Sequence, residues 1–447
     1  MKIIQENNSS SIIIFLAYEV GRSELIAFLK SMEKENLQHR LLIVTPPDLF
    51  DIFKELKNLC IVNDFRSLDS LIAAIEYLVR ERNLTVTDLM AIDEEEQFSI
   101  SRRIAEHFQL KFYSLKTCAI ASNKFLQKTI FAQNNIPTGH FTLISELNEK
   151  HINVIGFPNI LKVLSGNGSA YLFKNDNLEQ LQTHFEILKK SVKDVDSDSR
   201  FREQQIDLGE YKIILNPKNQ FLLEEYIGGE EYSCDFIVDK GHVRIIRVVK
   251  KYRGPFLGFF SGYLLLREED LAPNHIDLND LEAICLRITN SFEIESGVCM
   301  VDFKMNQGKF KLIESSIRPG LSAFNHLMYE IFGYTSLALM AKQKMGIEIE
   351  TLFPRENGAI IYLYADKNTI LDEPDITSLE QFRSEYNILH IHKFESSGLP
   401  VTDNLCDRSG YLIGYVMIKN PNSGQIPELA DLFNRNLKFI PRSKKNG

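Results

Sequence analysis

Short apolar runs alternate with amphipathic stretches along the first hundred residues. Four runs have the length and composition of buried strands: Ile12–Ala17, Leu41–Val44, Leu59–Val62 and Asp88–Ile92. Two stretches between them repeat apolar residues at helical spacing: Arg22–Lys34 and Leu68–Arg82. Strands that alternate with helices predict an open parallel sheet with helices on both faces, so we expect an α/β unit here.

An acidic run, Asp93–Glu96, directly follows the fourth predicted strand. Open parallel sheets bind ligands at the carboxyl ends of their strands, so these side chains could form the edge of a site. The helix dipole equally favours acidic residues at the start of a helix. The pattern leaves both interpretations open.

The pattern changes after the first unit. Ser122 is placed to cap a helix that runs to about Asn135, and β-rich segments follow to about residue 345. Strand-like runs then resume at Ala359–Tyr364, Ile388–Phe394 and Tyr411–Ile418. We therefore expect an α/β domain over 1–118, an α+β domain over 119–350 and a small β-rich domain over 351–447. The charged segment 189–205 is predicted to be a mobile surface segment.

Composition narrows the class of protein. The chain has 447 residues, of which 44% are hydrophobic and 25% are charged, as in soluble globular proteins. A formal net charge of -9 argues against a nucleic-acid partner, and the longest early apolar run is too short to span a membrane. Six cysteines occur singly: Cys60, Cys118, Cys234, Cys285, Cys299 and Cys406. Isolated cysteines favour reduced thiols, so we expect a cytoplasmic protein.

The first candidate for chemistry is a lysine at the end of a predicted strand. Ile160 and Leu161 precede Lys162, and the glycine- and serine-rich loop Ser165–Ser169 follows. Glycines let backbone N–H groups approach an anion, and a neighbouring lysine adds a positive charge for a phosphate. The loop lacks the GK[ST] ending of a P-loop. A glycine hairpin with a surface lysine is the alternative.

The second candidate is an apolar strand, Phe221–Leu223, that ends in Glu224 and Glu225. After the turn Gly228–Gly229, a second strand begins with further carboxylates at Glu230 and Glu231. Carboxylates in such positions accept hydrogen bonds from ribose hydroxyls in nucleotide-binding folds. A charged hairpin without a ligand remains the alternative.

The third candidate is a hairpin formed by Val301–Lys304 and Phe310–Ser316 around a glycine-containing turn. Asp302 and Glu314 each have apolar neighbours, and a buried carboxylate is costly unless it is paired or bound to a metal. Magnesium is often held by one or two carboxylates together with substrate phosphates. Arg318 follows and could bind a phosphoryl group or a carboxylate; an ion pair with the acids is the alternative.

These three groups of residues, in this order, resemble the ATP-grasp superfamily. Asn123-Lys124-Phe125 looks like the family's Asp-Lys element with Asn in place of Asp, and the run Asp407–Tyr415 looks like the closing domain of biotin-carboxylase-like members and L-amino-acid ligases. The resemblance covers most of the chain. It implies an ATP-grasp fold preceded by a Rossmann-like domain and followed by a small β-rich domain.

The resemblance also implies a role for each matching residue. ATP phosphates would be contacted by Lys124, Lys162 and the loop residues Ser165, Gly166, Gly168 and Ser169. The strand beside adenine would comprise Glu224, Glu225, Tyr226 and Ile227, with Glu231 at the ribose. The ligands of Mg²⁺, or alternatively Mn²⁺, would be Asp302, Glu314 and Ser316. Relatives carry Asn at the position of Ser316, whose hydroxyl is a weaker ligand, so the resemblance does not fix the number of metal ions.

A carboxylate–amine ligase is the function that the resemblance favours. Arg318 would stabilise an acyl phosphate made from a small acid such as an amino acid, and an amine would then displace phosphate. A carboxylase- or nucleotide-biosynthesis-type enzyme and a nucleotide-binding relative without activity are the alternatives. The partners would be small molecules, and a homodimer is allowed. The segment Lys250–Tyr263 would face the substrate: its aromatic residues either line an apolar pocket or belong to the core, and a Lys or Arg there could hold a carboxylate. His326 is either at the site or packed.

Overall fold

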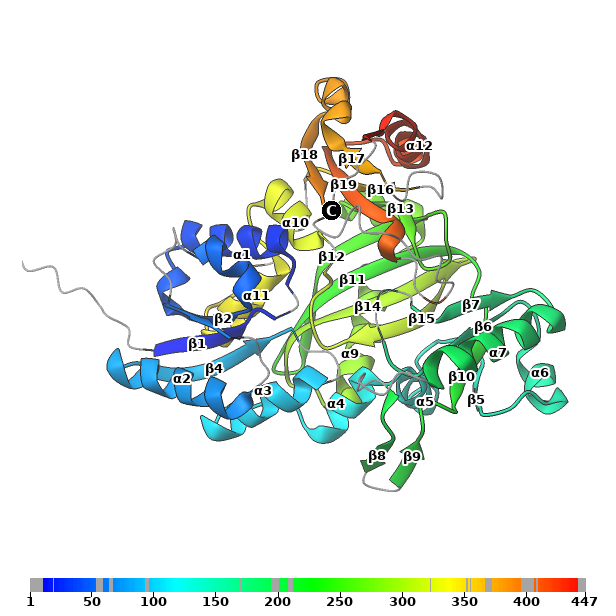
Figure 1. The fold of residues 1–447 in the computed structure, drawn as a ribbon, viewed down its shortest axis with the longest axis horizontal. Helices are drawn as coiled ribbons and strands as arrows, with labels where there is room; N and C mark the ends of the chain where they lie inside the picture. Colours follow the sequence, from blue (N-terminus) through cyan, green and yellow to red (C-terminus); the bar gives the residue numbers. More distant parts are fainter. Residues whose placement is uncertain are drawn as a thin grey trace, which may run out of the picture.

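The computed structural model describes residues 11–18, 20–53, 59–63, 67–92, 96–166, 168, 170–193, 201–207, 212–321, 323–350, 353, 355–365, 372–394, 406 and 409–440. Figure 1 shows a parallel sheet formed by the N-terminal residues, a small antiparallel sheet on the opposite side, and a large sheet between them. This mixed α/β architecture has the parallel N-terminal sheet that the sequence predicts.

The N-terminal sheet has the strand order β3-β2-β1-β4, and all neighbouring strands are parallel. Its strands are β1 (Ser11–Leu16), β2 (Leu41–Thr45), β3 (Leu59–Val62) and β4 (Thr85–Ala91), and its helices are α1 (Arg22–Lys34), α2 (Leu68–Glu81) and α3 (Glu96–His107). Ile13 and Phe15 pack with α1, whereas Ile12 and Ile14 pack in a separate cluster with α2 and α3. Helices therefore cover both faces, as predicted.

The small antiparallel sheet has the order β5-β10-β6-β7. Its strands are β5 (Phe141–Ile144), β6 (Asn159–Lys162), β7 (Leu172–Asn175) and β10 (Phe221–Glu225), and the neighbouring helices are α4 (Leu115–Ser122), α5 (Lys124–Gln133), α6 (Glu149–Ile155) and α7 (Leu178–Lys193). Leu161 and Leu223 pack against the apolar side of α7. Because side chains alternate along a strand, Lys162 and Glu224 face the opposite side.

The large sheet has the order β15-β14-β11-β12-β13-β16-β19-β18 and is antiparallel throughout. Its strands are β11 (Glu230–Asp239), β12 (His242–Arg253), β13 (Phe260–Leu265), β14 (Ser296–Asn306), β15 (Lys309–Ser316), β16 (Gly358–Tyr364), β18 (Ile388–Lys393) and β19 (Leu412–Lys419). The last three strands come from the predicted C-terminal unit, and β16 pairs directly with β13. They therefore extend the same sheet that carries the β14–β15 hairpin.

Shorter elements complete the described chain. The remaining α-helices are α8 (Glu268–Leu271), α9 (Leu278–Phe292), α10 (Phe324–Phe332), α11 (Ser336–Lys344) and α12 (Ile426–Asn436). Two further strand pairs are β8 (Gln204–Asp207) with β9 (Lys212–Leu215), and β17 (Glu373–Asp375) with β20 (Lys438–Ile440). The 3-10 helices are η1 (Gln38–Arg40), η2 (Pro47–Phe53), η4 (Ala272–Asn274), η5 (Ile376–Phe382), η6 (Ser409–Tyr411) and η7 (Ser423–Gln425).

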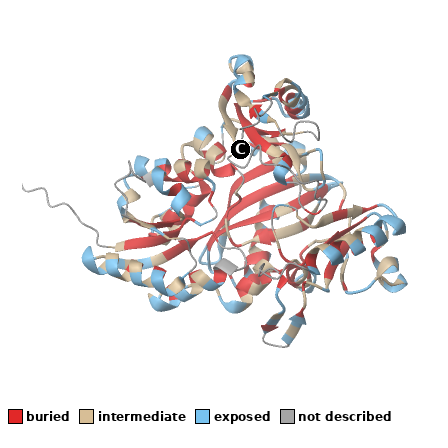
Figure 2. Cartoon of the chain, viewed as in Figure 1, coloured by how far each residue is buried: buried red, intermediate tan, exposed pale blue. Residues whose placement is uncertain are grey.

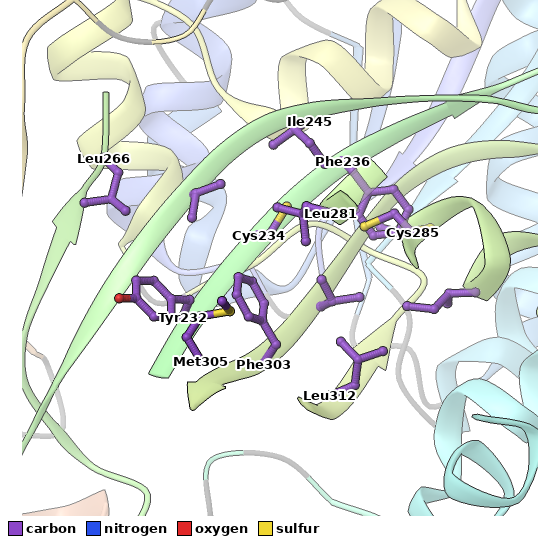
Figure 3. Close-up of a cluster of buried hydrophobic side chains, with 14 of the residues drawn as sticks. Tyr232, Cys234, Phe236, Ile245, Leu266, Leu281, Cys285, Phe303, Met305 and Leu312 are labelled. Atoms are coloured by element: carbon purple, nitrogen blue, oxygen red, sulfur yellow. The ribbon is translucent and has the colours of Figure 1, made fainter. Parts of the chain in front are cut away.

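One face of the large sheet forms the largest apolar cluster. Figure 3 shows Cys234, Phe236 and Phe303 pointing from the strands toward Leu281 and Cys285 of α9. Strands β11 and β14, in the middle of this region of the sheet, are buried along most of their length (Figure 2). Because this face is closed by α9, the alternate side chains of β11 and β14 point to the other face, where the polar residues of the candidate site lie.

Several sequence predictions need a correction or fall outside the described residues. Ser122 does not cap the following helix: the side chain of Asn123 accepts from the backbone N–H groups of Phe125 and Leu126, and the hydroxyl of Ser122 donates to the carbonyl of Cys118. The helix ends at Gln133, two residues before the approximate end predicted at Asn135. Most of the acidic run 93–96, residues 194–200 of the predicted mobile segment, Ser169, Asp407 and Arg408 lie outside the described residues. No helix in the described ranges is long and apolar enough to cross a membrane.

Candidate functional site

A buried ion-pair group lies on the open face of the small sheet. Lys162, the last residue of β6, lies 2.5 Å from Oε1 of Glu224 on β10, measured from Nζ. The Nζ atom of Lys128 on α5 lies 3.3 Å from Oε2 of the same carboxylate. All three side chains are less than a tenth exposed. Burial alone would raise the pKa of Glu224, but the charges of Lys128 and Lys162 outweigh it and lower the pKa below its usual value.

Hydrogen bonds connect the glycine loop after β6 to the start of α5. The Nζ atom of Lys124 donates to the carbonyl of Gly166 at 2.7 Å, and its backbone N–H donates to the carbonyl of Leu164. The hydroxyl of Ser165 donates to the carbonyl of Ser122. Gly166 and Gly168 have φ values of 126° and 63°, which other residues adopt only with strain. The loop thus needs its glycines for its backbone conformation.

Two acids meet on the large sheet. Asp302 on β14 pairs directly with Glu314 on β15, so their side chains lie on the same face. Nζ of Lys251, on β12, lies 2.6 Å from Oδ2 of Asp302, and Nζ of Lys124 lies 3.0 Å from Oε2 of Glu314. Lys124 therefore links the glycine loop of the small sheet to the acid pair of the large sheet.

The two acids differ in pKa although they are neighbours. Burial raises the pKa of Asp302, and the charges of Glu314 and Glu231 add to this effect against the opposing charge of Lys251. Burial acts in the same direction on Glu314, but Lys124 and Lys162 reverse it and lower the pKa of Glu314 to about 2. Glu314 is therefore charged at neutral pH, ready to bind a cation.

A β-bulge sets the direction of Glu314. The pairing of β14 with β15 shifts between Asp302 and Phe303, which pair with Glu314 and Leu312 and leave Ile313 as the extra residue. Without the shift, Leu312 and Glu314 would share a face. Instead Leu312 is buried in the main apolar cluster, while Glu314 faces the polar side. Because of the bulge, strand β15 places Leu312 in the apolar core and Glu314 in the candidate site.

The predicted adenine and ribose residues lie beside these acids. Glu225 accepts from Lys311 at 2.8 Å and from the backbone N–H of His140. The ring of Tyr226 has Nζ of Lys304 at 4.9 Å and Nζ of Lys174 at 5.0 Å from its centroid. Both ammonium groups are within the range of cation–π attraction, so Tyr226 is held in place.

Glu231 lies between two lysines across three strands. Its carboxylate oxygens lie 3.4 Å from Nζ of Lys251 and 3.6 Å from Nζ of Lys304. Glu231 pairs with both lysines in the register of the sheet, so all three side chains lie on one face. Ile227, the last residue predicted for the adenine strand, is buried at the same cavity.

A buried network holds the turn that carries Arg318. The backbone N–H of Gly320 donates to Oδ1 of Asp235 at 2.9 Å, and the same carboxylate forms two hydrogen bonds with Arg247 at 2.8 and 2.9 Å. Ser336 donates to Oδ2 of Asp235 at 2.7 Å. Asp235 and Arg247 are fully buried. Arg318 itself donates to the carbonyl of Pro319 at 3.0 Å.

One cavity of about 540 Å³ brings these groups together. Of the predicted site residues, those lining it are Lys124, Lys162, Gly166, Gly168, Glu224, Glu225, Tyr226, Ile227, Glu231, Asp302, Glu314, Ser316 and Arg318. Ser165 is not among the described residues that line it, because its hydroxyl is turned to Ser122. His326 is packed against Tyr415, with Nδ1 3.1 Å from the phenol oxygen. Burial, followed by the neighbouring histidines, lowers the pKa of His326 to about 3.

Sequence reasoning missed several residues of the site. Lys304 lines the cavity and Lys128 lies behind it, although neither was singled out as a site residue. Lys251, which lies in the predicted substrate segment, also lines the cavity. For Lys304 a signal existed, because it stands two positions after Asp302 on the same predicted strand. Phe259, Phe260 and Tyr263 of the predicted substrate segment also line the cavity.

The acid pair fits a magnesium ion bound together with phosphates. Oδ1 of Asp302 is buried and has no hydrogen-bond partner in the described part of the chain, so it is an acceptor available to a cation. Ser316 lies two residues beyond Glu314 and lines the same cavity. No group of three or more His, Cys, Asp or Glu side chains suited to a metal is found in the described ranges. Two carboxylates are nonetheless the usual protein contribution to a Mg²⁺ that also binds phosphate.

Comparison with known proteins identifies a matching domain and a shared fold. Residues 155–320 match the family described as ATP-grasp domain. No curated protein sequence matches the chain. An L-amino acid ligase from Bacillus licheniformis is similar in structure, with a TM-score of 0.68, 14% identity, and 97% of this chain and 99% of that chain covered.

Two further solved structures show the same arrangement. N5-carboxyaminoimidazole ribonucleotide synthetase from Thermotoga maritima has a TM-score of 0.63 at 16% identity, with 97% of this chain and 99% of that chain covered. N5-carboxyaminoimidazole synthetase from Staphylococcus aureus, complexed with ADP, has a TM-score of 0.65 at 12% identity, with coverage of 95% and 97%. The likeness over nearly the whole chain shows that the fold is shared, as the sequence predicted.

Proposed function

We propose that this chain, whose fold is the ATP-grasp fold and whose residues 155–320 match the ATP-grasp domain, is an ATP-dependent carboxylate–amine ligase that releases ADP and phosphate. One observation carries the proposal: the lysines and glycine loop of the small sheet share one cavity with the Asp302–Glu314 pair of the large sheet. Lysines beside a glycine loop, together with two acids on the same cavity, are groups suited to bind Mg-ATP.

Each part of the cavity has a role in binding ATP. Lys124, Lys162 and the backbone of Gly166 and Gly168 hold the phosphates, because glycine backbone and ammonium groups both stabilise oxyanions. Glu225, Tyr226 and Ile227 lie beside the adenine. Glu231 accepts hydrogen bonds from the ribose, and its two lysines fix its position.

Asp302 and Glu314 hold Mg²⁺, and the hydroxyl of Ser316 adds a weaker ligand. The orphaned Oδ1 of Asp302 and the low pKa of Glu314 suit them to this role. When bound, Mg²⁺ neutralises charge on the phosphoryl oxygens. The ion pairs of Lys124 and Lys251 with these acids support the view that both acids are ionised in the cavity.

The reaction joins an acid to an amine in two steps. A carboxylate oxygen of the acid attacks the γ-phosphorus of ATP, the bond to the β-phosphate oxygen breaks, and ADP leaves. The amine nitrogen then attacks the acyl carbon, loses a proton and expels inorganic phosphate. Arg318 stabilises the negative charge of the acyl phosphate and of the tetrahedral intermediate, since a guanidinium binds such oxyanions bidentately.

Product analysis tests the proposal. Purified protein is incubated with Mg-ATP and a panel of acid and amine pairs, and the nucleotide and phosphate products are separated. ADP and inorganic phosphate, formed in equal amounts and only when both acid and amine are present, are expected. AMP and pyrophosphate would contradict the proposal. ADP release that needs bicarbonate but no amine would instead identify a carboxylase.

A further inference from the structure

The cavity has a second end that the nucleotide does not explain. Beyond the acid pair, its walls are formed by aromatic and aliphatic side chains of β13, β16 and the segments around them. The members of this aromatic end are Phe259, Phe260, Tyr263, Phe324, Tyr362 and Tyr364. Four of the rings form one connected set around Tyr263, with centroid separations of 4.8 Å to Phe324, 5.1 Å to Tyr362 and 5.4 Å to Phe260. Phe259 packs with Tyr364 at 6.4 Å.

The hydroxyl groups of this end are already used within the protein. Tyr364 donates to the carbonyl of Phe260 at 2.7 Å. Tyr263 and Tyr362 hydrogen-bond to each other through their side chains. Because these hydroxyl groups are hydrogen-bonded to the protein, the ring atoms that line the cavity present an apolar surface to a ligand. The aromatic end is therefore suited to a flat apolar group.

Most charged groups of the cavity lie at its nucleotide end, around the acid pair and the glycine loop. Among the described lining residues the cations are Lys124, Lys162, Lys251, Lys304 and Arg318. The four lysines pair with acids of the nucleotide end, and Arg318 lies on the turn after β15. The cations nearest to the aromatic end are Lys251, 4.9 Å from the centroid of the Phe260 ring, and Arg247, 4.0 Å from that of Phe324. Each is already paired with an acid of the protein, Asp302 or Asp235, so a phosphate placed there would have to compete with that acid.

Lys251 marks the junction between the two ends. Its Nζ atom lies 2.6 Å from Asp302 and 4.9 Å from the centroid of the Phe260 ring. Lys251 also pairs in register with Tyr263 on the neighbouring strand. A carboxylate at Lys251 would therefore lie beside the acid pair, and the rest of the same molecule would lie against the rings of the aromatic end.

We infer that the acid substrate carries an aryl or similarly flat apolar group, which binds in the aromatic end while its carboxylate docks at Lys251. This inference rests on the proposed function, because it assigns the acid of the ligase reaction. It specifies the acid by chemistry: an aryl-substituted carboxylate, such as an aromatic amino acid, in preference to a short-chain acid, bicarbonate or a phosphorylated acid.

Equilibrium binding tests the inference without relying on turnover. The protein is loaded with Mg²⁺ and a non-hydrolysable ATP analogue, and four probes are titrated by calorimetry: 3-phenylpropionate against propionate, and phenylalanine against alanine. Each pair differs by one phenyl ring. We expect the aryl member of at least one pair to bind about 30-fold more tightly or better, as burial of a ring predicts.

Two variants of one loop provide a matched comparison. Phe259 lines the cavity, whereas Phe256 contacts Phe259 and Tyr411 outside it. Phe259→Ala is expected to weaken aryl binding at least about tenfold and to leave propionate or alanine binding unchanged. Phe256→Ala is expected to leave both unchanged. Equal binding within each probe pair, no binding of any probe, or equal effects of the two variants would overturn the inference.

The outcomes also separate this inference from the proposed function. Aryl binding without ADP release for any amine would support the inference and contradict the ligase proposal. Amine-dependent ADP release with short acids only, together with no aryl preference in binding, would support the ligase and overturn the inference.

Discussion

Asp302 and Glu314 lie directly opposite each other on β14 and β15, and each is held by a different lysine, Lys251 or Lys124. The two lysines come from different parts of the fold, since Lys251 is on the large sheet and Lys124 begins α5 beside the small sheet. The acid pair is thus the point at which both halves of the cavity meet.

Removing the charge of either acid should weaken metal binding. For Asp302→Asn and Glu314→Gln, we expect turnover to fall at least about 100-fold and the Mg²⁺ concentration for half-maximal rate to rise at least about tenfold. Ser316→Ala should have a smaller effect, because a hydroxyl is a weak ligand. Steady-state rates across a Mg²⁺ titration measure both quantities. Glu356→Gln, which breaks an exposed ion pair with Lys419, is the control, and an equal effect there would contradict the assignment.

Glu224 should contribute to the stability of the protein. Glu224→Gln leaves Lys128 and Lys162 buried without a counter-charge, so we expect the free energy of unfolding to fall by about 3–5 kcal/mol. Urea denaturation measures this loss.

The neighbouring residue offers a matched control for that variant. Glu225 pairs with Lys311, and both side chains are about a third exposed. Glu225→Gln should therefore reduce the free energy of unfolding by no more than about 1 kcal/mol. Similar losses for the two variants would show that the buried ion pairs do not stabilise the small sheet in this way.

The turn that carries Arg318 should tolerate no side chain at Gly320. A Cβ atom there would lie 2.1 Å from Nη2 of Arg247, so Gly320→Ala must displace either the Arg247–Asp235 pair or the turn. We expect kcat to fall at least about tenfold, because a shift of about 1 Å at a catalytic group is costly. Gly21→Ala is the control, since an added Cβ there meets nothing within 4 Å. A normal kcat for Gly320→Ala would contradict a positioning role for this network.

Glu24 should make stability depend on pH. This residue of α1 is buried and accepts from the backbone and side-chain amide of Asn325. Burial raises the pKa of Glu24 to about 7, although hydrogen bonds from Asn325 and the charges of Arg318 and Arg247 oppose the shift. At pH values between 4.5, the pKa of Glu24 in the unfolded chain, and about 7, Glu24 is largely protonated in the folded protein and largely ionised in the unfolded chain. The stability that this group contributes is therefore present at low pH and is lost as the pH rises toward 7.

Comparison with Glu24→Gln isolates this group. The variant cannot ionise, so its free energy of unfolding relative to the unmodified protein should increase by up to about 3 kcal/mol between pH 5 and pH 8. Denaturation at several pH values measures the difference. A difference that stays constant across this range would show that Glu24 titrates with an ordinary pKa.

Local sequence patterns predicted the helices and hairpins that are formed by residues close together in the chain. The helix Arg22–Lys34 has the predicted bounds, and the hairpin of Asp302 and Glu314 was evident from its apolar runs and its turn. Both features depend on neighbours along the chain. The helical period and the alternation of strand residues carry that information directly.

These local patterns could not predict which strands pair with each other or in which register. The bulge at Ile313 depends on the register between β14 and β15, and only that register shows that Leu312 and Glu314 face opposite sides. Lys128 looks like a surface lysine on its helix, yet it is buried against Glu224 of a strand nearly a hundred residues away. The addition of β16 to β13 likewise follows from contacts that no local pattern contains.

Transfer of an isotope label from the acid to phosphate tests most directly whether the enzyme forms an acyl phosphate. The acid with the fastest amine-dependent ADP release is prepared with ¹⁸O in its carboxylate, and the inorganic phosphate is analysed by mass spectrometry. Because a carboxylate oxygen attacks the γ-phosphorus and leaves with it, we predict one ¹⁸O atom in each phosphate released. Phosphate without the label, or label found in AMP, would contradict an acyl-phosphate ligase at the Asp302–Glu314 site.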